Sequence, residues 1–150
     1  MALAVGGADA MTYNNKGSAL DGLKRYQEAV ECYDRAIELD PTCASFHGNK
    51  GLALEHLGRL KEALESIGKA IQLEPMEHEH YVFGGSIIAK LGEHERAIIC
   101  FDKALFIEPS SKQALIRKGK SLVETQNASE AIQCFTEAIE IDPHNVEAFE

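Results

Sequence analysis

The residues whose types could do chemistry are a short histidine and glutamate run, four cysteines and two recurring asparagines. His78 and His80 alternate with Glu77 and Glu79, and imidazole and carboxylate are common ligands of divalent metals. Consecutive side chains near the start of a helix point in several directions, however, whereas histidines at i and i+4 would share a face. We therefore expect no metal site and no other cofactor.

The sequence also lacks the arrangements typical of an enzyme. We find no nucleophile with a plausible base, no glycine loop that could cradle phosphate and no Cys-x-x-Cys pair. Cys32, Cys100 and Cys134 share one position of an internal repeat. Helices one repeat apart lie roughly 10 Å from each other, which exceeds the reach of a disulfide. We expect reduced thiols in a cytoplasmic protein without enzymatic activity.

Composition excludes several further classes of function. The 150 residues carry a net charge of −9, which disfavours nucleic-acid binding because such binding relies on clustered cations. The apolar runs are too short to span a membrane. Residues 1–9 lack the basic and apolar regions of a signal peptide, and we expect them to form a lead-in.

The elements that must position any functional side chain repeat at a step of 34 residues. The most similar stretches run without insertion or deletion over Ala29–Pro41, Ala63–Pro75, Ala97–Pro109 and Ala131–Pro143. A glycine lies 24 residues before each proline, at Gly17, Gly51, Gly85 and Gly119. A period of this size predicts a solenoid built from one supersecondary unit.

Each unit has the pattern of two helices joined by a turn. In the first unit we expect helices from Met11 to about Leu23 and from Gln27 to Leu39, where Pro41 prevents continuation. We expect Gly17 to face the alanines of the second helix and to allow close approach. The fourth turn contains Gln126 and Asn127 where glycine would be usual, and Asn127 can tolerate the left-handed conformation.

With these positions the chain resembles the tetratricopeptide repeat family. Its pattern is an aromatic residue, Leu-Gly-x-x-Tyr, then Ala-x-x-x-Phe-x-x-Ala and Pro, as in Tyr81, Gly85, Ile88, Ala97, Phe101, Ala104 and Pro109 of the third unit. The resemblance implies an all-α fold, a right-handed solenoid of antiparallel helix pairs. The repeats would span 10–43, 44–77, 78–111 and 112–145 in one domain, with 146–150 beginning a truncated fifth. Core-like residues at Val146, Ala148 and Phe149 therefore suggest a fragment of a longer array and end-to-end self-association.

The same resemblance implies a function, because the first helices of such repeats line a concave groove that binds peptides or partner helices. The positions expected to line it include Ser86 and Glu124. The groove residues that we single out are Asn15, Asn49, Leu52, Val82, Phe83, Lys90, Ile116, Arg117 and Lys120. The apolar members would form a strip with the cations beside it, which suits a segment with apolar anchors and some acidic residues.

Two of these assignments have alternatives. Asn15 and Asn49 occupy equivalent positions and resemble the asparagine ladder of the repeat domain in O-linked N-acetylglucosamine transferase, where amides pair with a peptide backbone. They could instead recur merely because the repeats duplicated. Phe83 could pack inside its own unit, although Tyr81 and Gly85 already fill the core positions around it.

The carboxylate clamp of chaperone-tail binding domains is a poor match. Its positions would fall on Asn14, Ser18, Asn49, Glu79 and Phe83, of which only Asn49 agrees and Glu79 would repel a carboxylate. We therefore expect a protein-interaction scaffold with an unidentified partner. The alternatives are the substrate-recruiting part of a larger enzyme that continues past Glu150, and a self-assembling structural array.

Overall fold

The computed structural model describes residues 2–141, with side chains from residue 10 onward, and the chain divides into two compact units, Met1–Pro75 and Met76–Glu150. The first unit contains α1 (Ala2–Gly22), α2 (Tyr26–Leu39), α3 (Ala44–His56) and α4 (Leu60–Leu73). The second contains α5 (His78–Lys90), α6 (His94–Ile107), α7 (Lys112–Glu124) and α8 (Ala128–Ile141). Residues 2–141 form no strand, so the predicted all-α class is confirmed.

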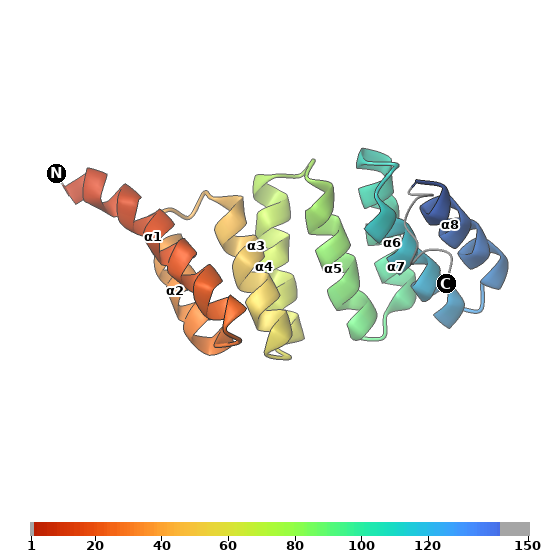
Figure 1. The fold of residues 1–150 in the computed structure, drawn as a ribbon, viewed down its shortest axis with the longest axis horizontal. Coiled ribbons are helices and arrows are strands. Elements are labelled where there is room, and N and C mark those ends of the chain that lie inside the picture. The colour runs from red at the N-terminus through yellow and green to blue at the C-terminus, as the bar shows by residue number, and fades with distance from the viewer. Residues whose placement is uncertain (1, 142–150) are drawn as a thin grey trace. The chain divides into compact units, whose positions relative to one another are not determined.

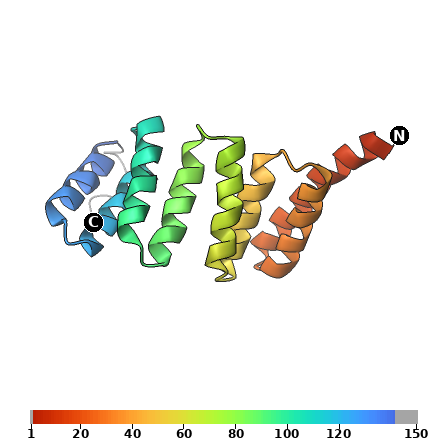
Figure 2. The ribbon, with the colours of Figure 1, turned by 180° about the vertical axis from the view of Figure 1, so that it is seen from behind.

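Each unit consists of two helical hairpins, and the two helices of a hairpin lie side by side in both views (Figure 1, Figure 2). The predicted bounds of α2 are correct to within one residue. The backbone of Asp40, before Pro41, is extended, as expected for a residue that precedes proline. In contrast, α1 begins at Ala2, nine residues before the predicted Met11, so that the expected lead-in is helical. The predictions for Pro143, Val146, Ala148 and Phe149 lie outside the described residues.

The repeat glycines lie where the two helices of a hairpin meet. A Cβ added to Gly17, Gly85 or Gly119 would lie only 2.5–2.6 Å from a ring carbon of Tyr33, Phe101 or Phe135, respectively. The predicted close approach is therefore confirmed, but the partner is wrong. An aromatic ring of the second helix, sixteen residues later, covers each of these glycines, whereas we expected alanines opposite Gly17.

The turns inside the hairpins share one backbone conformation. Lys24, Gly58, Gly92 and Gln126 occupy equivalent repeat positions and all have positive φ, from 62° to 86°. In the fourth turn the left-handed residue is Gln126 and not Asn127, although asparagine tolerates this conformation better. The backbone N–H of Asn127 donates to the carbonyl of Leu122 at 2.8 Å, which ends the helix in the pattern of a Schellman motif.

Within each unit, consecutive hairpins are joined by packing and by one equivalent ion pair. In the first unit Lys50 Nζ lies 2.7 Å from Asp34 Oδ1, and in the second Lys118 Nζ lies 2.6 Å from Asp102 Oδ1. These lysines occupy the position before the repeat glycine, where the family has leucine. They connect a first helix to the second helix of the preceding repeat. No helix in the described part of the chain is long and apolar enough to cross a membrane.

Candidate functional site

The second unit contains a hollow of about 260 Å³ over helices α5, α6 and α7. Its lining residues are Ser86, Ala89, Lys90, His94, Phe101, Arg117, Lys120, Ser121 and Glu124. On α7, the other lining residues follow Arg117 by three, four and seven positions, a spacing that places side chains on one face of a helix. The helical spacing therefore brings these side chains to the same hollow.

The charge of this hollow is the reverse of that of the whole chain. Its lining contains Lys90, Arg117 and Lys120 but one carboxylate, Glu124, whereas the chain has a net charge of −9. Arg117 and Lys120 are exposed, and neither forms an ion pair with another residue in the range 2–141. Their charges are therefore available to a ligand, and an acidic group would gain from both.

Hydrogen bonds fix the polar floor of the hollow. The Ser86 hydroxyl donates to the carbonyl of Val82 at 2.8 Å, within its own helix. Ser121 is buried, and its Oγ lies 3.5 Å from Nδ1 of His94, a contact that connects α7 to the start of α6. Phe101 adds an apolar surface beside these groups and is fully buried against Gly85. The floor of the hollow therefore combines hydrogen-bonded polar groups with one ring, while the cations lie at its exposed edge.

The equivalent first helices of unit one are occupied by contacts with each other. The amide of Asn49 donates to Oδ1 of Asn14 at 3.0 Å. Near the other end of these helices, Nδ1 of His56 lies 3.4 Å from Oδ1 of Asp21. The centroid of the His56 ring lies 4.6 Å from the centroid of the Tyr26 ring. This surface is hydrogen-bonded and mixed in charge, so it does not favour one sign of ligand.

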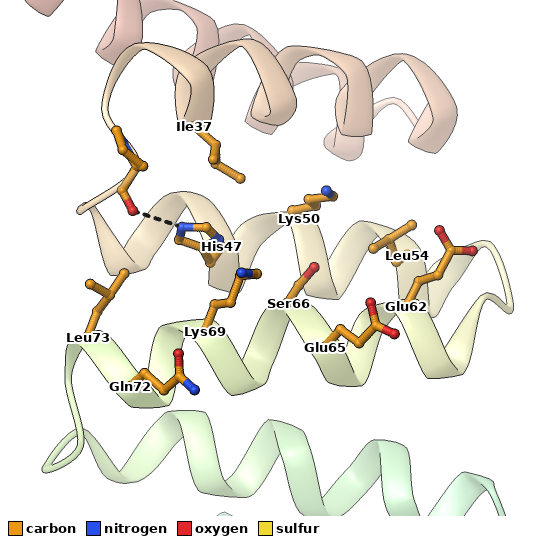
Figure 3. A pocket seen from close by; sticks show the side chains of 11 residues that line it. Ile37, His47, Lys50, Leu54, Glu62, Glu65, Ser66, Lys69, Gln72 and Leu73 are labelled. Atoms are coloured by element: carbon orange, nitrogen blue, oxygen red, sulfur yellow. Dashed lines mark hydrogen bonds between the residues drawn. The ribbon is translucent and has the colours of Figure 1, made fainter.

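A larger hollow of about 390 Å³ lies on unit one between α3, α4 and the end of α2 (Figure 3). Lys50 and Lys69 line it together with Glu62 and Glu65, and Lys50 is already paired with Asp34. At one end, Nε2 of His47 lies 3.1 Å from the carbonyl oxygen of Pro41 (dashed in Figure 3). Despite its size, this hollow has balanced charges and contains none of the predicted groove residues, so we regard the smaller one as the candidate site.

Three of the nine predicted groove residues come together in the candidate site: Lys90, Arg117 and Lys120. Asn15 is exposed on α1, and Leu52 and Phe83 are half-buried on their helices. Asn49 pairs with Asn14, which lies next to the residue that we expected to share its role.

One prediction needs correction. Val82 is 3% exposed and belongs to a core cluster with Ala104 and Ala114, because the next hairpin packs against it. Ile116 is half-buried, as Leu52 and Phe83 are, and its buried part packs against the cluster that joins α7 to α8. The expected apolar strip therefore loses Val82 to the core.

Four residues of the hollow were not among the predicted groove positions: Ala89, His94, Phe101 and Ser121. His94 starts α6 and Phe101 is a core position, so neither belongs to a first helix of the repeat pattern. Ala89 and Ser121 belong to first helices, but each lies beside a predicted groove residue and not at a groove position of the repeat. Only the approach of α6 to α7 brings His94 and Phe101 to the site.

The histidine and cysteine candidates have structural surroundings. The carboxylate of Glu77 caps α5 by accepting from the amide of Glu79 and lies 3.4 Å from Nδ1 of His78. No group of three or more potential ligands could hold a metal among the residues that the structure describes. All four cysteines are free thiols, and burial raises the pKa of Cys100 and of Cys134.

Solved structures with a similar fold are tetratricopeptide repeat domains. MamA (residues 41 to end) from Desulfovibrio magneticus RS-1 is 23% identical, with a TM-score of 0.84 over 92% of this chain and 78% of that one. The TPR domain of Arabidopsis OM64 is 24% identical, with a TM-score of 0.76 over 79% and 98%. The first TPR of Spaghetti (RPAP3), bound to the HSP90 peptide SRMEEVD, is 22% identical, with a TM-score of 0.77 over 80% and 95%. No curated protein matches the sequence significantly.

These likenesses confirm the predicted fold class, an α-solenoid of antiparallel helix pairs. Family models described as tetratricopeptide repeat match residues 10–43, 32–65, 82–111 and 113–145. The repeats, which match that family's models, support a protein-interaction scaffold. The matches extend over most of the sequence, and the chain belongs to the tetratricopeptide repeat family.

Proposed function

We propose that this chain is a protein-interaction scaffold and that the face of α5 and α7 binds an acidic segment of a partner protein. The observation that carries the proposal is the hollow lined by Lys90, Arg117 and Lys120 in a strongly acidic chain. A peptide carboxylate placed there would form charge-assisted hydrogen bonds. The helices fix the backbone positions of these cations, so that binding has to order only their side chains and not the chain that carries them.

A structure with a similar fold supports an acidic ligand, although it does not identify the partner of this chain. The peptide bound to the first TPR of Spaghetti, SRMEEVD, contains three acidic residues. Only Asn49 matches the clamp positions of such domains, so we infer a different acidic ligand. Asn15, Asn49, Leu52, Phe83 and Ile116 remain proposed contacts for other parts of that ligand. We propose the cytoplasm as its location, where the free thiols would stay reduced.

The test is affinity capture from cell lysate with the chain and with its Arg117→Glu/Lys120→Glu variant. The control is Lys61→Glu/Lys69→Glu, which changes the net charge equally on α4. The relevant proteins are those captured by the chain and by the control but not by Arg117→Glu/Lys120→Glu, the groove variant. These proteins would be purified and titrated against all three. We expect the dissociation constant of the groove variant to be at least about tenfold higher, which corresponds to a loss of about 1.4 kcal/mol in binding free energy. The binding of the unmodified chain should weaken as the salt concentration rises. Equal affinities of the chain and the groove variant for every partner would reject the proposed site.

A further inference from the structure

The second helices of the four repeats provide an internal comparison that singles out α6. At the third position of the repeated stretch the residues are Glu31, Glu65, Ile99 and Gln133, and at the tenth they are Glu38, Gln72, Phe106 and Glu140. Three copies are polar at both positions, so the helix pair does not need apolar side chains there. The third copy alone has two large apolar residues.

Both side chains are exposed on the surface of α6. Ile99 is 56% exposed and Phe106 is 84% exposed, the highest value among the exposed large apolar residues of the described chain. They are seven residues apart, which places them on one face, roughly 10 Å from each other along the helix. The buried side of α6 consists of Ala97, Phe101 and Ala104. Phe101 faces the hollow described above, so Ile99 and Phe106 form a separate surface.

Charge limits what can cover this pair. Lys103 lies between the two anchors on the same face and is exposed, with no ion pair among the residues 2–141. Its neighbours are already engaged, since Arg96 pairs with Glu93 and Asp102 pairs with Lys118. Glu95 lies a turn before Ile99, outside the stretch between the anchors. A segment that buries both anchors also covers Lys103, and covering an unpaired cation is costly unless a carboxylate meets it.

A second copy of the chain does not meet this requirement. Lys103 lies almost midway between Ile99 and Phe106, so a two-fold pairing of α6 with itself, parallel or antiparallel, would bring Lys103 close to its own counterpart. Like charges at such a contact are unfavourable. The net charge of −9 adds a general repulsion between copies.

We propose that Ile99, Lys103 and Phe106 form a docking surface for an amphipathic helix of another protein. That helix would present two apolar residues seven positions apart, with an acidic residue between them opposite Lys103. The spacing follows from matching two turns of one helix to two turns of another. The surface is independent of the proposed groove and would let the scaffold hold a second partner.

The test uses two synthetic helical peptides labelled with a fluorophore. Each has leucines seven positions apart, and they differ only in a Glu or a Lys between the leucines. Fluorescence anisotropy should show the Glu peptide binding the chain at least about tenfold more tightly than the Lys peptide, a difference of about 1.4 kcal/mol. Lys103→Glu should reverse this preference.

Two further protein variants separate this surface from others. Ile99→Glu/Phe106→Gln installs the residues of the second repeat and should abolish binding while the circular dichroism melting curve stays unchanged. Arg117→Glu, in the groove, should bind the Glu peptide as the unmodified chain does. Absence of binding to the unmodified chain, equal affinity for both peptides, or binding that survives the double variant would each overturn the proposal. So would sedimentation showing self-association that requires Ile99 and Phe106, since a second copy would then be the occupant.

Discussion

The ring of Phe101 lies where a side chain on Gly85 would be: a Cβ at Gly85 would approach Cε1 of Phe101 to 2.5 Å. Real Cβ atoms do not come so close to a ring, and Phe101 is 1% exposed, packed between the two helices. The missing side chain therefore sets the distance between α5 and α6. It also sets the base of the candidate site, because Phe101 lines the hollow.

Gly85→Ala should destabilise the second unit. Overpacking typically costs about 1–3 kcal/mol, which outweighs the gain of up to about 1 kcal/mol from placing alanine in a helix. The matched control is Gly68→Ala in α4, where an added Cβ would meet nothing within 4 Å, and which should be neutral or stabilising. Urea denaturation followed by circular dichroism measures both. If Gly85→Ala were as stable as Gly68→Ala, the close contact would not exist in solution.

Gln126→Gly should stabilise the fourth repeat, because Gln126 has a φ of 63° while Gly92 holds the equivalent position with a φ of 86°. A left-handed conformation costs a residue with a side chain roughly 1 kcal/mol or more, and glycine avoids most of it. We expect a gain of about 0.5–1 kcal/mol in the free energy of unfolding. Asn127→Gly is the control and should be neutral or destabilising. The opposite order of the two variants would place the left-handed residue at Asn127.

The ion pair between Lys118 and Asp102 should contribute measurably to the free energy of unfolding, in a way that depends on pH. A double-mutant cycle with Lys118→Met and Asp102→Asn should give a coupling of about 0.5–1 kcal/mol at pH 7, as for other partly exposed pairs. Partial burial opposes the charged form of Lys118, but the hydrogen bond and charge of Asp102 prevail and raise its pKa.

The sign of this pH dependence follows from the raised pKa. The stabilisation is fully present below the unfolded-state pKa of lysine, about 10.4, and is lost as the pH rises through the higher folded-state value. The coupling should therefore be constant from pH 7 to 9 and disappear at strongly alkaline pH. A coupling that persisted after the lysine lost its proton would argue for packing and not for charge.

The thiols of Cys100 and Cys134 should react slowly with iodoacetamide in the folded chain. Burial raises the pKa of both, so less of the reactive thiolate is present at pH 8 than in the unfolded chain. Mass spectrometry of the alkylated peptides measures each cysteine separately, with the chain in urea as the control. Lys103 and Arg96 counteract the shift at Cys100, so Lys103→Glu should slow Cys100 further and leave Cys134 unchanged. Alkylation of the folded chain at the unfolded rate would contradict this.

The helices and their order were predictable from the sequence because each repeat carries the same local signals. The proline after α2 and the apolar spacing of the second helices act within about a dozen residues, so no knowledge of distant contacts was needed. The positions of Lys90, Arg117 and Lys120 on one surface were predictable for the same reason. Helical geometry relates them once the repeat is known.

The sequence did not show which side chains at the edge of a helix's apolar face are covered by the neighbouring hairpin. Val82 and Phe83 are adjacent and both apolar, yet Val82 is in the core and Phe83 is half-buried. Likewise, the position of Gly17 could be predicted, but the ring of Tyr33 that covers it could not. Successive residues of a helix are rotated by 100° from each other. The packing between helices therefore decides whether a side chain at the edge of the apolar face is buried or exposed. The repeat pattern thus determined the elements and their register, while the contacts between helices decided which side chains remain free to bind a partner.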